Sequence, residues 1–316
     1  MNFEFEKEIV ELENKIVEMK KFSEEKGIDL SGEISRFVAE RDEKLKEIYK
    51  NLSSWDKVFV WRHPERPYTL DYIENIATDF IELHGDRNFG DDKSTIGGIA
   101  ELDGIPVTII GEQKGKNAKE NIERNFGMPN PESYRKAIRF MKQAEKFKRP
   151  VITFIDTKGA YPGIEAEEKG QGEAIAKSMF EMAKLKVPII SIVVGEGSSG
   201  GALAIGVANK VFMLENAIYS ILSPEGYSSI LWKDASKFKE AAEKMKLTAK
   251  DLFELKVIDK IIKEPKEYNE GNFKKVANSL KKEIQKEIEQ MKYLNGNQIV
   301  ENRYMKFRNM GEFKEV

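Results

Sequence analysis

The stretch PIISIVVGEGSSGGALAIG, residues 188–206, joins an apolar run to a glycine-rich turn and then to an alanine-rich segment. The β-branched run 188–194 predicts a buried strand. We expect a loop over 195–201 and a short helix from Ala202 onward. A buried strand that runs through a glycine-rich loop into a helix is typical of a parallel α/β sheet.

The same order of elements occurs once more, upstream of this stretch. VITFIDT (151–157) predicts a second buried strand, KGAYPG (158–163) a loop, and the following residues a helix near 165–185. Two consecutive strand–loop–helix units predict a parallel α/β core.

The rest of the chain surrounds this core with further predicted elements. Residues 64–67 carry prolines that argue against regular structure, and a helix is expected to resume at Thr69–Leu83. The other expectations are two strands within 96–113 joined at Asp103-Gly104, a basic polar loop over 115–127, a helix over 131–147, short strands at 210–214 and 217–222, a helix capped by Ser223 with Pro224 at its first position, and a charged helix over 272–292.

Both ends of the chain are predicted to lie outside the core. Apolar residues recur at helical spacing in 5–21 and again in 34–48, which predicts a helical hairpin. That hairpin would pack on its own domain or on a partner. We divide the chain into a helical extension (1–32), a main domain (33–292) and a tail (293–316).

The composition excludes several kinds of chemistry. The 316 residues include no cysteine and two histidines, and 52 basic residues nearly balance 54 acidic ones. Thiolate nucleophiles and cysteine-held metals are therefore excluded, and no global charge favours nucleic acid. No apolar run approaches a membrane span and the N-terminus lacks a signal core, so we expect a cytoplasmic protein without a membrane anchor.

The glycine-rich turn is the main candidate site. Gly200, Gly201 and Ala202 place free amide groups at a helix start directly after a buried strand. Amides in this position form an anion site, and glycine lets a ligand oxygen approach the backbone closely. Such an arrangement suits an oxyanion hole. The alternative is a tight turn whose glycines serve packing only.

Two other patterns overlap the same turn. Gly195, Gly197 and Gly200 spell the dinucleotide-binding pattern G-x-G-x-x-G, with Glu215 at the distance of a ribose ligand. The helix that follows is expected to be short, and no further alternating strand–helix units come after residue 222. Both points argue against a dinucleotide-binding domain. Gly197-Ser198-Ser199-Gly200-Gly201 also spells the nucleophile pattern G-x-S-x-G, but both histidines, His63 and His84, precede it by more than a hundred residues.

The upstream loop offers a second set of amides. This loop contains Gly159, Ala160, Tyr161 and Gly163, and the alternative is an ordinary turn without a ligand. The loop is followed by three acidic residues, Glu165, Glu167 and Glu168. They could act as a general acid and base, but acidic residues in the first turn of a helix are the preferred interpretation. The loop 115–127 carries cations that either meet the phosphates of a ligand such as coenzyme A or are simply solvated: Lys114, Lys116, Lys119 and Arg124.

Five motifs in fixed order resemble one family. They are GGIAELDGIPVTIIGEQKG (97–115), RNFGMPNPESYRKA (124–137), FIDTKGAYPG (154–163), GEGSSGGALAIG (195–206) and SPEGYSSILWK (223–233). Together they resemble the alpha subunits of bacterial acetyl-CoA carboxylase carboxyltransferases over roughly residues 33–265. The predicted helices at both ends of the chain are of the kind that the family has, but they carry no motif.

The resemblance implies a fold, a reaction and partners. The fold would be an α/β, crotonase-like (ClpP/crotonase) superhelix of repeated ββα units with helical extensions at both ends. The reaction would transfer a carboxyl group from carboxybiotin to acetyl-CoA, giving malonyl-CoA for fatty acid biosynthesis. Biotin would ride on a separate biotin carboxyl carrier protein charged by an ATP-dependent biotin carboxylase. A beta subunit, in an alpha2beta2 assembly, would complete the active site and hold the family's structural metal, so none is expected here.

The resemblance also assigns roles to residues. Gly200, Gly201 and Ala202 would hold the urea oxygen of biotin through their amides, and Gly197 with the 159–163 loop would line the biotin site. Two positions depart from the family pattern: Lys158 stands where proline is usual, and Glu112 stands where histidine is usual. The second departure argues against a catalytic role at that position.

Two other functions remain open at this point. A self-contained hydratase of the same fold would use Glu165 or Glu196 as acid and base. A non-catalytic scaffold would dock through the N-terminal hairpin. The carboxyltransferase differs from both because it would need a beta subunit for activity.

Overall fold

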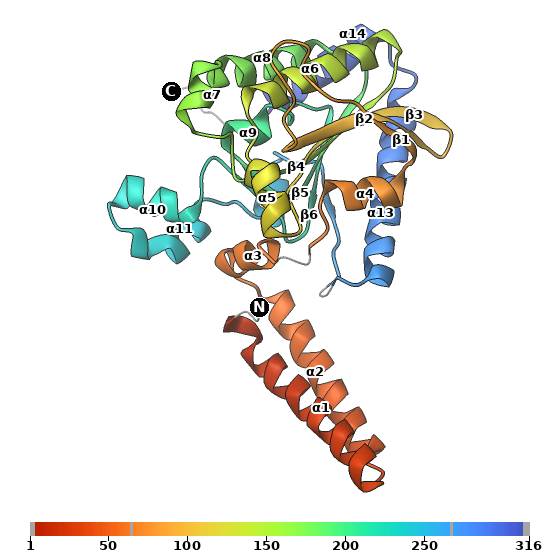
Figure 1. Ribbon diagram of the computed structural model, residues 1–316, viewed down its shortest axis with the longest axis vertical. Coiled ribbons are helices and arrows are strands. Elements are labelled where there is room, and N and C mark those ends of the chain that lie inside the picture. The colour runs from red at the N-terminus through yellow and green to blue at the C-terminus, as the bar shows by residue number, and fades with distance from the viewer. Residues whose placement is uncertain (1–3, 64–65, 266–267, 312–316) are drawn as a thin grey trace.

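The computed structural model describes residues 4–63, 66–265 and 268–311, and part of the irregular segment expected at 64–67 lies outside them. An α/β body carries a long helical hairpin that projects from one end, and a small helical pair, α10 and α11, lies at one side (Figure 1). The α/β class and the parallel core predicted from the sequence are confirmed.

One eight-stranded sheet forms the centre of the described chain. Its order is β1-β2-β3-β4-β5-β6-β8, and β7 pairs with the end of β5 beside that path. The strands are β1 (Thr78–Glu82), β2 (Thr95–Leu102), β3 (Ile105–Glu112), β4 (Val151–Thr157), β5 (Ile189–Ser198), β6 (Lys210–Leu214), β7 (Ile218–Ser220) and β8 (Lys260–Ile262). The pairs β1·β2 and β2·β3 are antiparallel, whereas every pair from β3 to β8 is parallel.

Helices cover both faces of the sheet. They are α1 (Lys7–Lys26), α2 (Ser31–Lys50), α3 (Ser54–Trp61), α4 (Thr69–Ile76), α5 (Ala118–Glu123), α6 (Pro131–Lys146), α7 (Ile164–Glu168), α8 (Gln171–Lys184), α9 (Ser199–Leu203), α10 (Pro224–Trp232), α11 (Phe238–Lys244), α12 (Ala249–Glu254), α13 (Glu270–Met291) and α14 (Gly296–Arg308), with single 3₁₀ turns η1 (Glu4–Glu6), η2 (Asn125–Gly127) and η3 (Ala235–Lys237). Helix α6 packs on α8, and α13 packs on α4.

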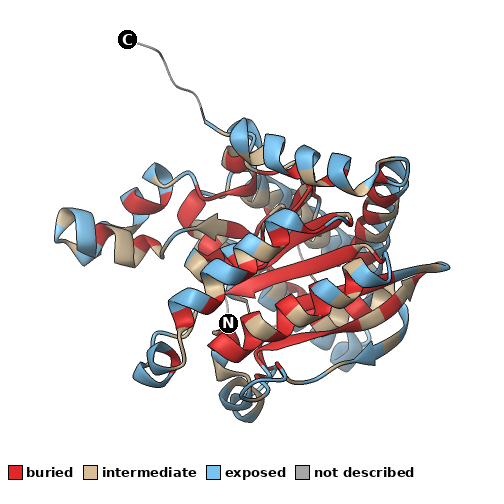
Figure 2. Cartoon of the chain, turned by 90° about the horizontal axis from the view of Figure 1, so that it is seen from above, coloured by how far each residue is buried: buried red, intermediate tan, exposed pale blue. Residues whose placement is uncertain are grey.

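The core lies where the central strands meet these helices. Every residue of β4 and of β5 is buried, as the continuous β-branched runs predict for strands covered on both faces. Figure 2 shows the buried strands between helices whose outward faces are exposed. Burying apolar area at about 25 cal/mol per Å² makes this layer the main source of stability.

The hairpin of β2 and β3 turns at the predicted dipeptide. Asp103 and Gly104 both have positive φ, at 47° and 86°. These angles match the twist of the flanking strands, and the ladder pairs Leu102 with Ile105 across the turn.

Several predicted elements have other bounds in the structure. The helix expected over 69–83 ends at Ile76, and β1 follows because residues 78–82 pair with the edge of β2. The polar loop 115–127 contains α5, which Asn117 caps. The helix near 165–185 is interrupted at Gly170, whose φ is 78°.

The two ends of the chain are more helical than expected. The predicted N-terminal hairpin is confirmed, but its second helix runs to Lys50, and Gly27 at φ 65° ends the first. Within the segment assigned to a tail, 293–316, the described part forms α14, which starts at a capping box on Asn295. How these helices divide into domains stays a prediction.

Helix α14 is held to the core by a buried arginine. The guanidinium of Arg303 donates hydrogen bonds to the carbonyl oxygens of Met182 and Leu185 (both 2.8 Å) and to that of Val187 (2.9 Å). These carbonyls belong to the end of α8 and the segment after it, where a helix leaves its last carbonyl groups without partners. Burial lowers the pKa of Arg303 to about 10, so the side chain stays charged at neutral pH.

Replacing this arginine should destabilise the fold. Arg303→Met removes the donors and leaves several buried carbonyl oxygens unpaired, which should lower the free energy of unfolding by about 3 kcal/mol. Urea unfolding followed by circular dichroism measures the change. Arg308→Met, at an exposed position of the same helix, is the matched control, and equal losses in both variants would contradict this role.

Candidate functional site

The two glycine-rich turns border one cavity of about 650 Å³. Its walls come from the loop after β4, the junction of β5 with α9, the segment before α10, and Arg62 after α3. Gly159, Ala160 and Gly200 line the cavity as predicted. The other predicted site residues are not among its lining residues: Tyr161, Gly163, Gly197, Gly201 and Ala202.

The junction of β5 with α9 differs from the predicted loop. The strand continues through Ser198, and α9 begins directly at Ser199, whose φ of 56° reverses the chain. No described residue accepts a hydrogen bond from the N–H of Gly200 or of Gly201, as expected for the first residues of a helix. Gly200 thus brings a backbone donor without a protein acceptor to the edge of the cavity.

Gly201 is needed because two stretches of backbone approach each other there. A Cβ at this position would lie 2.8 Å from the amide nitrogen of Ala160 and from the carbonyl carbon of Gly159. At Gly200 the nearest atoms to an added Cβ are those of Ile175, at 3.4 Å. The close approach therefore locks the two predicted loops together at Gly201.

Two amides of the upstream loop are already used. The N–H of Gly159 donates to Oγ1 of Thr157 (3.0 Å), and the N–H of Tyr161 donates to the carbonyl of Pro129 (2.9 Å). The ring of Tyr161 packs beside Gly163, where a Cβ would lie 2.4 Å from it. This loop therefore shapes the cavity wall rather than offering a row of donors.

A buried group of charged residues lies directly beneath the turns. Nζ of Lys114 is 2.5 Å from Oδ1 of Asp156. The same oxygen accepts a hydrogen bond from the N–H of Glu196 (3.0 Å), and Glu112 accepts one from the N–H of Asp156 (2.9 Å). Lys114 also stacks over the ring of Trp61, with Nζ 4.6 Å from its centroid. The cation predicted to meet ligand phosphates is thus held inside by Asp156.

Two carboxyl groups of this set favour the neutral form. Burial raises the pKa of Glu196, and it raises the pKa of Glu112 well above its ordinary value. Oε2 of Glu196 has no partner among the described residues, and its residue lines the cavity. Glu196 therefore places a carboxyl group with a raised pKa and one buried, unpartnered oxygen at the wall of the cavity.

Sequence reasoning missed a charged pair at the mouth of the cavity. Arg62 lies 3.1 Å from Glu225, and both line the cavity. They are 163 positions apart, so spacing along the chain carried no signal for the pair. The one available hint was Glu225 in the first turn of a predicted helix.

The overlapping patterns find no support in this geometry. Ser199 lies exposed at the turn, but neither His63 nor His84 lines the cavity, so a hydrolytic serine would have no histidine base there. Helix α9 spans five residues, and Glu215 pairs with Lys263 (2.5 Å) instead of facing the turn.

The described residues also hold no group of three or more side chains suited to a metal ion. In the same part of the chain, no helix has the length and apolar character needed to cross a membrane.

Comparisons with known proteins agree with the motifs. Residues 2–311 match the family described as acetyl co-enzyme A carboxylase carboxyltransferase-like. The chain is 56% identical to acetyl-coenzyme A carboxylase carboxyl transferase subunit alpha of Geobacillus kaustophilus, over 98% of this chain and 95% of that protein. The subunit of the same name from Listeria monocytogenes serotype 4a is 54% identical, over 98% of both chains.

Solved structures share the fold. Transcarboxylase 12S matches 80% of this chain and 44% of its own, with a TM-score of 0.57 and 17% identity. The beta subunit of geranyl-CoA carboxylase from P. aeruginosa matches 84% of this chain and 48% of its own, with a TM-score of 0.55 and 17% identity. The predicted crotonase-like fold is confirmed by these likenesses.

The contact at Gly201 predicts unequal effects of two neighbouring substitutions. Gly201→Ala forces the backbone of 159–160 away and should lower the free energy of unfolding by about 1–3 kcal/mol, as overpacking does. Gly200→Ala, whose nearest neighbour is the side chain of Ile175, should cost less. Thermal unfolding of both variants checks this, and a larger loss for Gly200→Ala would refute the proposed packing role.

The raised pKa of Glu196 predicts a pH-dependent stability. The folded chain keeps a proton that the unfolded chain releases as the pH rises. The contribution of Glu196 to the free energy of unfolding is therefore fully present below its unfolded pKa, and it is lost as the pH rises toward the higher folded value. Glu196→Gln cannot titrate, so it should gain stability relative to the unsubstituted protein between about pH 5 and about pH 8. Urea unfolding at both pH values measures this difference.

Glu165→Gln is the control for this prediction. Glu165 lies exposed on α7, where folding removes little hydration from its carboxylate. The same gain in both variants would show that burial of Glu196 is not the cause.

Proposed function

This chain belongs to the family of acetyl-CoA carboxylase carboxyltransferase alpha subunits, and on that basis we propose that it forms the biotin-facing half of the active site. The family membership makes it a carboxyl-transferring enzyme subunit of a biotin-dependent carboxylase, with a beta subunit as its partner. The proposed reaction moves a carboxyl group from biotin on a separate carrier protein to acetyl-CoA and yields malonyl-CoA for fatty acid biosynthesis.

The observation that carries this proposal is the unused backbone donor at the cavity. The N–H groups of Gly200 and Gly201 have no acceptor among the described residues, and Gly200 lines a cavity of about 650 Å³. When bound, biotin supplies the carboxyl group to be transferred. The amides of this turn would hold its urea oxygen, where negative charge develops during transfer. The loss of one such donor typically costs about 3 kcal/mol of barrier.

The buried charges beneath the turn support the same role. The carboxylate of Asp156 accepts a hydrogen bond from the backbone N–H of Glu196 and pairs with Lys114. The floor of the cavity is therefore rigid, and the charge of Asp156 is balanced by that of Lys114. Burial raises the pKa of Glu196, which disfavours a negative charge beside a developing oxyanion. This chain therefore supplies donors rather than a strong base, which fits a reaction whose proton acceptor lies outside it.

Apolar side chains around the cavity favour a partner that closes it. Ile221 lines the cavity and is 72% exposed, and Ile230 and Leu231 of the neighbouring α10 are about as exposed, at 61% and 59%. Neighbouring exposed apolar side chains are typical of a protein interface. We propose that the beta subunit covers this face and excludes water, in an assembly of two alpha and two beta chains that also receives the biotin carrier and works with biotin carboxylase.

A hydratase is the second candidate, because Glu196 lines the cavity and one of its carboxyl oxygens has no partner among the described residues. Glu165, the other acid considered, is exposed on α7 and does not line the cavity. The two functions differ in whether the chain acts alone. A hydratase would add water to an enoyl-CoA without any second subunit.

The decisive experiment reconstitutes the enzyme. The full chain is purified alone and together with its beta subunit, and malonyl-CoA formation is measured with acetyl-CoA and carboxylated biotin carrier. Activity should require both subunits, and Gly201→Ala in an assembled complex should lower the rate by at least about tenfold. Hydration of crotonyl-CoA by the isolated chain, or full activity of the Gly201→Ala complex, would contradict the proposal.

A further inference from the structure

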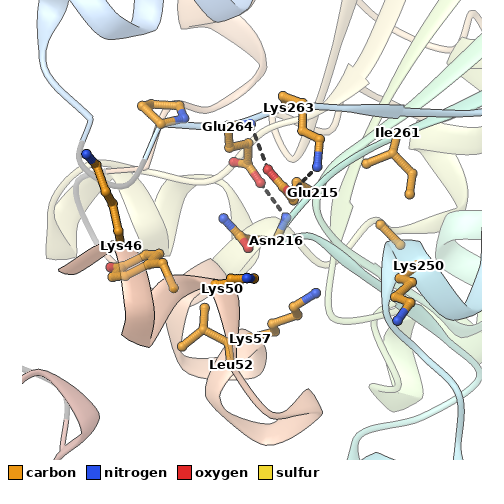
Figure 3. A pocket seen from close by; sticks show the side chains of 13 residues that line it. Lys46, Lys50, Leu52, Lys57, Glu215, Asn216, Lys250, Ile261, Lys263 and Glu264 are labelled. Carbon is orange, nitrogen blue, oxygen red and sulfur yellow. Dashed lines mark hydrogen bonds and ion pairs between the residues drawn. The ribbon is translucent and has the colours of Figure 1, made fainter. Parts of the chain in front are cut away.

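A second cavity, of about 590 Å³, lies between the N-terminal hairpin and the α/β body. The end of α2 and the start of α3 form one wall, and α12, the turn after β6 and the end of β8 form the other (Figure 3). Its volume is in the range of small-molecule sites. It shares no lining residue with the cavity at Gly200.

Lysine dominates the charged side chains of this second cavity. Figure 3 shows Lys46, Lys50 and Lys57 on the wall formed by α2 and α3, and Lys250 and Lys263 on the opposite side. These residues come from α2, α3, α12 and the segment after β8, so only folding brings them together. Five ammonium groups around one hollow produce a strongly positive potential there.

The carboxylates of the cavity are already neutralised. Glu215 pairs with Lys263 (2.5 Å). Glu264 pairs with Arg66 (2.6 Å), and its other oxygen accepts a hydrogen bond from the N–H of Asn216. Among the described residues, Lys46, Lys50, Lys57 and Lys250 have no carboxylate within ion-pair distance. The cavity thus retains four ammonium groups that form no ion pair with a described carboxylate.

The electrostatic cost of this arrangement is visible at Lys57. Its side chain is half-buried, and burial lowers its pKa. Glu215 and Asp251 oppose this shift, and the cations Lys250 and Lys263 add smaller contributions that lower the pKa. An anion in the cavity would relieve both the repulsion and the loss of hydration, which is the condition for favourable anion binding.

We propose that this cavity binds a small anion that carries a diphosphate, of the nucleoside diphosphate class. Flexible ammonium groups contact phosphate as point charges from several directions. Apolar surface for a nucleoside comes from both walls of the same cavity, through Leu52, Tyr49, Ile261 and Pro265. A diphosphate of this kind comes either from a free nucleotide or from the adenosine diphosphate part of coenzyme A.

Helix α3 places the two cavities close together. Lys57 lines the second cavity and Arg62, which follows the same helix, lines the first. Five residues of helix span about 7.5 Å. The inference does not depend on the proposed reaction, because the charge balance of the second cavity exists without it.

Calorimetric titration of the full chain tests the inference. The probes are inorganic pyrophosphate, ADP and coenzyme A at low salt, where charge attraction is least screened. Lys46→Gln/Lys50→Gln, an exposed i,i+4 pair on α2, should weaken pyrophosphate and ADP binding by about tenfold or more. Tighter binding of coenzyme A than of ADP would assign the site to coenzyme A, and equal or weaker binding would assign it to a free nucleotide.

A matched pair of lysines provides the control. Lys282 and Lys286 are also exposed at i,i+4 spacing, on α13, and do not line the cavity. Lys282→Gln/Lys286→Gln should leave all affinities unchanged. The inference is overturned if none of the three probes binds at millimolar concentration, or if both lysine pairs weaken binding equally. Circular dichroism confirms that the variants stay folded, since all four positions are exposed.

Discussion

The parallel pairing of β4 with β5 is the constraint on which the rest of the site depends. The ladder pairs Val151 with Ile189 and continues to Thr157 opposite Gly197. Since parallel strands end at the same edge of a sheet, the two glycine-rich turns that follow must meet there. They meet so closely that Gly201 has no room for a Cβ against Gly159 and Ala160. The position of the amide donor at Gly200 is thus set by main-chain packing.

A second layer of order lies beneath the turns. Lys114, Asp156, Glu112 and Glu196 form a connected buried group that fixes the floor of the cavity. Burial raises the pKa of two of its carboxyl groups, those of Glu112 and Glu196. At Glu112, where the resemblance predicted histidine, the carboxyl accepts a hydrogen bond from the backbone N–H of Asp156. The departure is accommodated as a structural contact.

The helical parts that surround the sheet connect the site to the rest of the molecule. Helix α3 contributes Lys57 to the lysine-lined cavity, and Arg62, which follows this helix, lines the cavity at Gly200. The N-terminal hairpin was expected to pack on its own domain or on a partner. In the structure its helix α2 forms part of one wall of the lysine-lined cavity. At the opposite end of the chain, Arg303 anchors α14 to the end of α8, which packs against the helix layer above the sheet.

The sequence by itself determined the elements whose stability is local or whose pattern is continuous. The β-branched runs at 151–157 and 188–194, the Asp103-Gly104 turn, and the helix cap at Ser223 are all where they were predicted, because burial on both faces, positive φ and capping are written in neighbouring residues. The motifs around Gly200 likewise located one wall of the cavity.

Only the tertiary structure decided the features that join distant residues. Strand β1 forms because an edge of β2 accepts it, and α14 is held by carbonyls more than a hundred positions away. The Arg62–Glu225 pair and the lysine-lined cavity have no spacing rule along the chain. Periodicity reports which face of one segment is apolar, but it carries no information about which other segment that face or charge will meet.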